Sequence, residues 1–287
     1  MLVSIIGTVV QGLLSGMVYG LMALGLSVIF GVVRVVNFAH GEMMVLAMYT
    51  AYIMNTATGL DPLLALPLVT LALFALGYGL QRGLINRFIA RPDNQQFLLL
   101  LAIATILTAS LLIGFGPDAR NVQVDYAYNS FELGPLLLDE VRVIAALGSL
   151  VAVAALWAFF RFTRTGKSIR ACADNQIGAA VVGLDVKRLY ALTFGVGAAC
   201  VGAAGCLMLL LVDVQPYVAS DYTLLAFIIV ILGGLGSMPG AMLGGILVGV
   251  AEALSARFIE PSFKSAISFA LLILVLLVRP QGLLGRA

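Results

Sequence analysis

The residues best suited to chemistry lie in one short polar segment, Asn37-Phe38-Ala39-His40-Gly41-Glu42, which is flanked on both sides by apolar residues. Polar and ionisable side chains at membrane depth are costly, and they usually mark a pathway or a pairing site. On a regular helix Asn37 and Gly41 share a face, but Glu42 lies about 140° away from Asn37. The polar groups can therefore converge only if the helix is broken here. We predict that they line a translocation path, with a short loop at the cytoplasmic surface as the alternative; the residues concerned are Asn37, His40, Gly41 and Glu42.

A second segment, Gly233–Gly240, interrupts the long apolar stretch 222–256 with four glycines and a proline. Such interruptions are typical of discontinuous membrane helices, whose freed backbone groups can line a cavity. We therefore predict that Gly233, Gly234, Gly236 and Ser237 belong to the same path. The alternative is a tight turn between two hairpinned helices.

The elements that must position these residues are membrane helices. Of the 287 residues, 62% are hydrophobic and only 10% are charged, and the mean hydropathy is +1.09, whereas soluble domains are about half apolar and a quarter charged. We predict an all-α, polytopic transmembrane bundle that forms a single domain over residues 1–287. Segments of roughly 20 apolar residues can cross the bilayer. The clear candidates for membrane-spanning segments are 5–30, 62–81, 97–116, 142–160 and 190–212. The less clear candidates are 38–56, 222–256 and 264–278. This predicts eight to ten crossings with discontinuous helices.

Two further sequence features concern packing and orientation. Glycines recur every four positions, a spacing that lets helix backbones approach closely; they are Gly12, Gly16 and Gly20, then Gly236, Gly240 and Gly244, then Gly245 and Gly249. Basic residues gather in alternate connecting segments, namely Arg82, Arg87 and Arg91, then Arg161, Arg164, Lys167, Arg170, Lys187 and Arg188, then Arg279 and Arg286. Because basic segments stay in the cytoplasm, we predict an N-terminus outside and a C-terminus inside.

One basic segment, Gly166–Arg188, is large enough to receive force from a cytoplasmic partner, although an ordinary solvated connector would have a similar composition. Gly166-Lys167-Ser168 resembles the end of a phosphate-binding loop, but Arg161 stands where that motif needs its first glycine.

A single histidine rules out a multi-histidine metal cluster, and a net charge of +2 gives no reason to expect a nucleic acid partner. The three cysteines fit packing better than disulfides. We therefore expect no metal and no cofactor on this chain.

Four segments together resemble the branched-chain amino acid permeases of bacterial ABC importers, in particular the shorter, LivH-like branch of that family. They are Gly31–Met43, Gly233–Ala241, the stretch with Arg170, Asp174, Ala180 and Gly183, and Arg279–Leu283. The resemblance implies a bacterial inner-membrane subunit that pairs with a longer paralogous permease. It also implies two cytoplasmic ATP-binding subunits that hydrolyse ATP, and an extracytoplasmic substrate-binding protein. Arg170, Asp174, Ala180 and Gly183 would form the loop that contacts the ATPase.

The expected function is thus that of a transporter subunit within the lipid membrane, not of an enzyme. It would translocate branched-chain or other neutral, hydrophobic amino acids. A urea or amide permease of the same family is one alternative. Another is an autonomous proton-coupled carrier or channel, in which His40 and Glu42 would relay protons.

Overall fold

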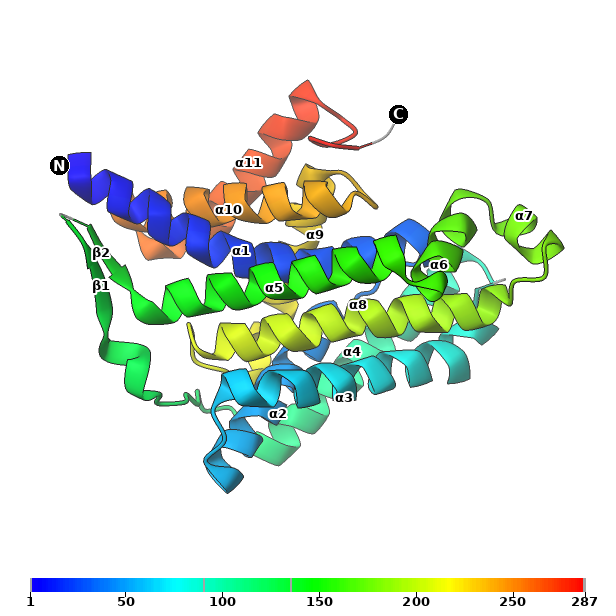
Figure 1. Cartoon of the computed structure of the whole chain (residues 1–287), viewed down its shortest axis with the longest axis horizontal. Coiled ribbons are helices and arrows are strands. Elements are labelled where there is room, and N and C mark those ends of the chain that lie inside the picture. The colour runs from blue at the N-terminus through cyan, green and yellow to red at the C-terminus, as the bar shows by residue number, and fades with distance from the viewer. Residues whose placement is uncertain (1, 90, 135, 286–287) are drawn as a thin grey trace.

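The computed structural model describes residues 2–89, 91–134 and 136–285, which form a bundle of long helices (Figure 1). The long helices are α1 (Leu2–Val33), α2 (His40–Thr58), α3 (Pro62–Gly83), α4 (Asp93–Phe115), α5 (Glu140–Phe162), α8 (Val186–Leu209), α9 (Ala219–Gly233), α10 (Met238–Phe258) and α11 (Lys264–Val278). The shorter elements are α6 (Arg164–Asp174), α7 (Gln176–Val181) and the strands β1 (Ser130–Leu133) and β2 (Leu136–Asp139). The strands form an antiparallel hairpin in which Ser130 pairs with Asp139. The predicted all-α bundle is confirmed, with this hairpin as a small addition.

Within the described residues, seven helical segments are long and apolar enough to cross a membrane, judged by length and composition. They are those of α1, α3, α4, α5, α8, α9 and α10, and α11 is a shorter apolar helix. The ambiguous stretch 222–256 is two helices, α9 and α10. The polytopic fold is confirmed, whereas the total of eight to ten crossings stays a prediction, because it requires α2 and α11 to contribute.

The bundle has two distinct ends (Figure 1). The N-terminus and the β1–β2 hairpin lie at one end, which we call the hairpin end. Helices α6 and α7 lie at the other, which we call the α7 end, and the described C-terminal residues lie on that side too. The two ends are separated by the length of the long helices, so they would face opposite sides of a membrane.

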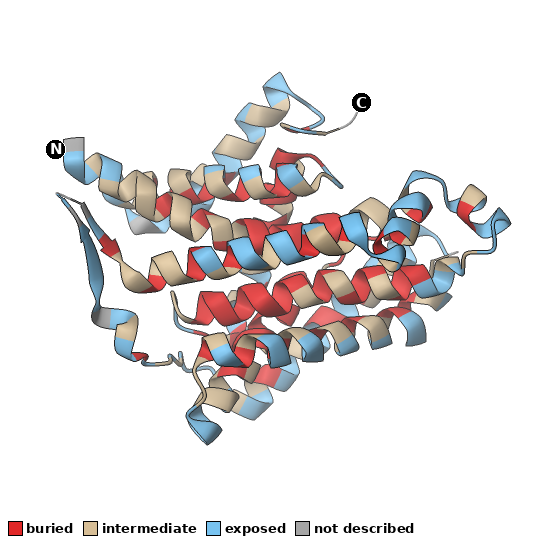
Figure 2. Ribbon diagram, viewed as in Figure 1, coloured by how far each residue is buried: buried red, intermediate tan, exposed pale blue. Residues whose placement is uncertain are grey.

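Helix α8 lies at the centre of the bundle, packed against α1, α2 and α3. Figure 2 shows buried residues concentrated along α8 and α1, while the outer faces of α3 and α5 are largely exposed. Those exposed faces are apolar, as shown by Leu68 on α3 and Trp157 on α5. Helix α4 likewise exposes Ile113. Water would penalise such surfaces and lipid would cover them, which agrees with the membrane assignment.

Helices α1 and α10 pack against each other through glycines. A Cβ atom at Gly16 would lie 2.7 Å from the carbonyl oxygen of Gly245 and 2.7 Å from the Cα of Ile246, and one at Gly12 would lie 2.8 Å from the carbonyl oxygen of Gly249. The two backbones are therefore in direct contact, as small residues permit in membranes. The predicted packing role of these glycines is confirmed.

Replacing Gly16 with alanine is expected to destabilise the protein, because the added methyl group meets backbone atoms that cannot rotate away. Overpacking of this kind costs about 1–3 kcal/mol. Gly79 is a matched control, since it lies in α3 with open space around its Cβ position; Gly79→Ala should be neutral or slightly stabilising. Thermal unfolding in detergent would measure the difference. Equal melting temperatures for the two variants would contradict the close α1–α10 contact.

Candidate functional site

The chain breaks its helix between α1 and α2. Helix α1 ends at Val33, and Arg34 adopts a left-handed conformation with φ 58°, which is uncommon and costly for a residue with a side chain. Residues 34–39 are not helical, and α2 begins at His40. The predicted break in this segment is confirmed.

The break leads back into the interior of the bundle. His40 Nε2 lies 2.9 Å from the carbonyl oxygen of Met22, and Met22 is roughly 16 Å along the α1 axis from Val33 at 1.5 Å per residue. Helix α2 therefore starts at mid-bundle depth. The alternative of a loop confined to the surface is wrong.

The side chains of the segment are buried and hydrogen-bonded. Asn37 Oδ1 accepts from the backbone N–H of Ala39 at 3.1 Å, which shapes the turn before α2. Asn37 Nδ2 points to the sulfur of Met43 at 3.7 Å. Because a carbonyl can only accept, His40 donates to Met22 from Nε2, and its Nδ1 has no partner among the described residues. His40 thus carries one spare hydrogen-bonding atom inside the bundle.

Thr223 of α9 joins the segment to a distant part of the chain. Its hydroxyl accepts from the backbone N–H of Gly41 at 2.8 Å and donates to Glu42 Oε2 at 3.1 Å. The first N–H groups of a helix have no partner within it, so Thr223 satisfies one of them at the start of α2. Sequence reasoning missed Thr223, because a threonine within an apolar helix commonly bonds only to its own backbone.

Gly41 allows α2 and α9 to meet. A Cβ atom at this position would overlap the carbonyl oxygen of Ala219, and it would lie 2.7 Å from the hydroxyl oxygen of Thr223. Nearby, the ring of Phe38 lies 5.2 Å from that of Phe227 and 4.7 Å from that of Phe97. Asn37 and His40 are fully buried and Glu42 is 4% exposed. The structure therefore shows a closed polar joint, which we define as Asn37, His40, Gly41, Glu42 and Thr223.

The glycine segment 233–240 forms the turn between α9 and α10. Gly234 and Gly236 have φ of 103° and 80°, a region that favours glycine, and Ser237 Oγ accepts from the N–H of Gly240 at 3.2 Å to cap α10. A Cβ atom at Gly233 would overlap the backbone of Gly240. The tight turn, one of the two alternatives from the sequence, is what the structure contains.

The structure does not bring the two predicted groups to the same depth. Gly236 lies against Gly31 near the end of α1, whereas His40 lies against Met22. These two points of α1 are roughly 14 Å apart along the helix axis. The glycine turn thus lies nearer the α7 end than the polar joint does.

Helices α6 and α7 form the predicted surface element. Thr163 and Asn175 cap them by accepting from the N–H groups of Gly166 and Gly178, at 2.9 and 2.8 Å. Gly183 ends the unit in a left-handed conformation with φ 87°. The four residues predicted to contact a partner, Arg170, Asp174, Ala180 and Gly183, are all exposed.

The inner face of α6 holds this unit on the bundle. Gly166 packs against the backbone of Phe159 and Phe160, so it lies within a helix and not in a phosphate-binding loop. Cys172 is buried, and burial raises the pKa of its thiol. All three cysteines are free and buried, which confirms the packing interpretation.

An apolar surface on and beside α7 was not predicted from the sequence. Ile177, Val181 and Val182 are 78%, 81% and 76% exposed, and we call these three residues the α7 patch. Exposed apolar residues that gather beside charged ones often mark a protein–protein contact. Nothing in the sequence distinguished them from core residues, because the same residue types fill the core.

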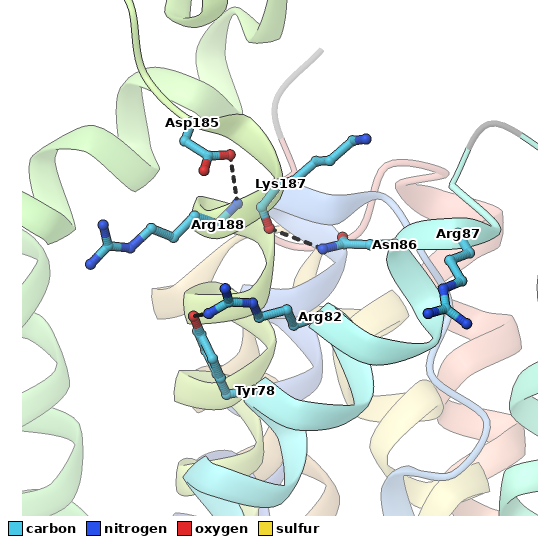
Figure 3. Close-up of a pocket in the computed structure, with 7 residues that line it drawn as sticks. All are labelled: Tyr78, Arg82, Asn86, Arg87, Asp185, Lys187 and Arg188. Atoms are coloured by element: carbon cyan, nitrogen blue, oxygen red, sulfur yellow. Dashed lines mark hydrogen bonds between the residues drawn. The ribbon is translucent and has the colours of Figure 1, made fainter.

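A basic cleft of about 540 Å³ lies between the end of α3 and the start of α8 (Figure 3). Arg82 donates to the hydroxyl of Tyr78 at 2.9 Å, and Asn86 donates to the carbonyl of Lys187 at 3.2 Å. Figure 3 shows the side chains of Arg87, Lys187 and Arg188 pointing in different directions. They therefore form a basic rim around this end of the bundle and do not converge on a single point.

Comparisons with known proteins agree with this architecture. Residues 8–276 match the family model described as "Branched-chain amino acid transport system / permease component". The chain is 34% identical to the high-affinity branched-chain amino acid transport system permease protein LivH of Salmonella typhimurium, covering 96% of this chain and 94% of that protein. It is 31% identical, with the same coverage, to the permease protein BraD of Pseudomonas aeruginosa. It is also 27% identical to the permease protein LivM of Escherichia coli, over 93% of this chain and 68% of that protein. No solved structure matches.

Proposed function

Because this chain belongs to the family of branched-chain amino acid transport permeases, we propose that it carries branched-chain, or other neutral and hydrophobic, amino acids across the bacterial inner membrane. It is a permease component of an ABC transport system and a multi-pass membrane protein, not itself an enzyme. The observation that carries the proposal is the match to both the family model and LivH over almost the whole chain. The polar joint inside an otherwise apolar bundle supports it.

The partners follow from the same relationship. Similarity to both LivH and LivM indicates a complex in which this chain pairs with a paralogous permease. We propose that two ATP-binding subunits hydrolyse the ATP, and that an extracytoplasmic binding protein delivers the substrate. The α7 patch supports a partner at the α7 end, since solvent-exposed apolar side chains become favourable when another protein covers them.

The proposed orientation places the hairpin end outside and the α7 end in the cytoplasm, with the N-terminus outside and the C-terminus inside. The basic rim of the cleft in Figure 3 lies at the α7 end, together with Arg164, Lys167 and Arg170. The segments at the hairpin end carry acidic residues instead, among them Glu132 in β1, Asp118 and Asp125 between α4 and β1, and Asp213 between α8 and α9. Basic segments are retained in the cytoplasm.

The translocation path is proposed to pass the polar joint of Asn37, His40, Gly41, Glu42 and Thr223. In the closed arrangement, backbone and side-chain groups satisfy one another, so opening would free polar groups for a zwitterionic substrate. Gly233, Gly234, Gly236 and Ser237 would serve the path by holding the turn that places α9 against α2.

Coupling to ATP hydrolysis is proposed to run through the surface around α7. Arg170, Asp174, Ala180 and Gly183 lie exposed around the α7 patch. Charged residues at the edge of an apolar contact favour a specific orientation of the partner. This surface would transmit movement of the ATP-binding subunits to α5 and α8, which flank it in the chain.

Replacing Gly183 with alanine is expected to reduce ATP-coupled uptake, because alanine can adopt the left-handed backbone of this position only at a cost of about 1–2 kcal/mol. Relief of that strain would shift the turn after α7. Gly59→Ala is the matched control, since Gly59 has φ 71°, equally open surroundings and a place at the hairpin end. The ratio of substrate transported to ATP hydrolysed should fall for the first variant only. Equal ratios would argue against a coupling role.

The test of the function is reconstitution of the chain with the products of its neighbouring genes in proteoliposomes. Leucine uptake should require ATP on the side of the membrane that carries the ATP-binding subunits. It should also require the binding protein on the opposite side. Competition among leucine, other neutral amino acids and urea then identifies the substrate. Preferential uptake of urea would favour the amide permease alternative, and proton-driven uptake by this chain alone would overturn the proposal.

A further inference from the structure

A second polar cavity lies at the hairpin end, apart from the polar joint. It has a volume of about 360 Å³ and lies among the first half of α1, the start of α5, the end of α10 and the start of α11. Its polar lining includes both charge signs and comes from four helices: Gln11, Tyr19, Arg142, Glu252, Arg257 and Lys264. Neither the polar joint nor the α7 patch involves these residues.

The single acid of the lining is almost entirely buried. Glu252 is 8% exposed, and its Oε1 accepts from the hydroxyl of Ser268 on α11 at 3.0 Å. A carboxylate within a membrane helix is expensive unless it is paired or functional. No Lys or Arg lies within salt-bridge distance of Glu252 among the described residues. The carboxyl group of Glu252 thus contacts a hydroxyl donor and forms no ion pair among the described residues.

The basic groups of the lining are held in place to different degrees. Arg142 is fixed, because its Nε bonds to Asp139 Oδ2 at 2.8 Å and its Nη1 donates to Ser15 Oγ at 3.0 Å. Arg257 donates to the hydroxyl of Ser4. Lys264 forms no ion pair within the part of the chain that the structure describes. A rigid guanidinium and an unpaired ammonium thus share a cavity with a buried carboxylate.

This combination of charges matches a zwitterion. A free amino acid carries an ammonium and a carboxylate on the same carbon, so it needs one acidic and one basic partner in the same cavity. Ala253 and Ala256 contribute small side chains to the lining, whereas Gly12 and Gly249 lie in the close contact between α1 and α10. Resting on the proposed function, we infer that this cavity is an outer vestibule site for the translocated amino acid. Glu252 receives its ammonium, and Arg142 and Lys264 receive its carboxylate.

The site is tested by thiol labelling of the complete importer. The native cysteines are buried, so Ala253→Cys places one accessible thiol in the cavity. A membrane-impermeant thiol reagent, added on the binding-protein side, should modify it. Leucine at millimolar concentrations should slow labelling about tenfold. 4-Methylpentanoate, which lacks the ammonium, and isopentylamine, which lacks the carboxylate, should give little protection.

A matched thiol and a matched acid serve as controls. Ser262→Cys lies exposed at the same end but outside the cavity lining, so it should label without protection by leucine. Glu252→Gln should abolish protection of the cavity thiol and lower uptake about tenfold, the loss expected when one charge-assisted hydrogen bond is removed. Glu260→Gln, an exposed acid at the same end, should leave both readouts unchanged.

The outcomes separate this inference from the proposed function. If the importer takes up leucine but the cavity thiol is unlabelled, or is protected equally by all three compounds, the vestibule site is refuted and the function stands. If Glu252→Gln fails to assemble, the protection pattern of the Ala253→Cys protein decides alone. If the unmodified complex takes up no leucine, the proposed function itself fails.

Discussion

Replacing Thr223 with valine is expected to lower uptake by the assembled importer at least about tenfold. Valine keeps the shape of threonine but removes the hydroxyl that accepts from Gly41 and donates to Glu42. Each buried polar group left without a partner costs about 1–3 kcal/mol. The variant should therefore disturb both the start of α2 and the side chain of Glu42. Uptake of radiolabelled leucine into proteoliposomes, normalised to the amount of assembled complex, measures the effect.

Thr223→Ser is the control for this prediction, since it keeps the hydroxyl and loses only a methyl group. It should retain most of the activity. A second comparison is Thr193→Val, which removes a buried hydroxyl from α8 that bonds only to the backbone of its own helix, at Leu189. Full uptake by Thr223→Val would place the polar joint outside the translocation path. Equal losses in the Thr223 and Thr193 variants would show that any buried hydroxyl matters.

Introducing aspartate at Val181 is expected to weaken association with the ATP-binding subunits by an order of magnitude or more. Burying a valine side chain contributes about 1.5–3 kcal/mol, and each 1.4 kcal/mol corresponds to about tenfold in affinity. An unpaired charge in the contact adds a desolvation cost. Because Val181 is 81% exposed in the isolated chain, the substitution should not disturb the fold.

Co-purification and ATPase activity of the solubilised complex check this result. Val181→Leu preserves the apolar surface and should bind normally. Lys167→Gln removes a charge from an exposed position of α6 at the same end, so it controls for a general change of the surface. Normal recovery of the ATP-binding subunits with Val181→Asp would show that the α7 patch is not the docking surface.

The sequence by itself determined the class of the protein and much of its local structure. A chain with so few charges can be stable only where lipid covers its apolar faces, so the membrane assignment followed from composition. Helix periodicity showed that Asn37 and Glu42 can converge only if the helix is broken here, because a regular helix holds them about 140° apart; the structure contains such a break at residues 34–39. The close packing of α1 was also predictable, because glycines at every fourth position give a helix a flat surface.

Tertiary structure alone decided which residues these local features meet. The hydroxyl of Thr223 lies 182 positions from Gly41, and no periodicity links residues so far apart in the chain. The segment 233–240 could have been a turn or part of a broken span, and the packing of α9 against α10 selected the turn. Ile177 and Val181 had the composition of core residues. Only the folded bundle showed that no helix among the described residues covers them, because burial depends on the neighbours a fold supplies and not on residue type.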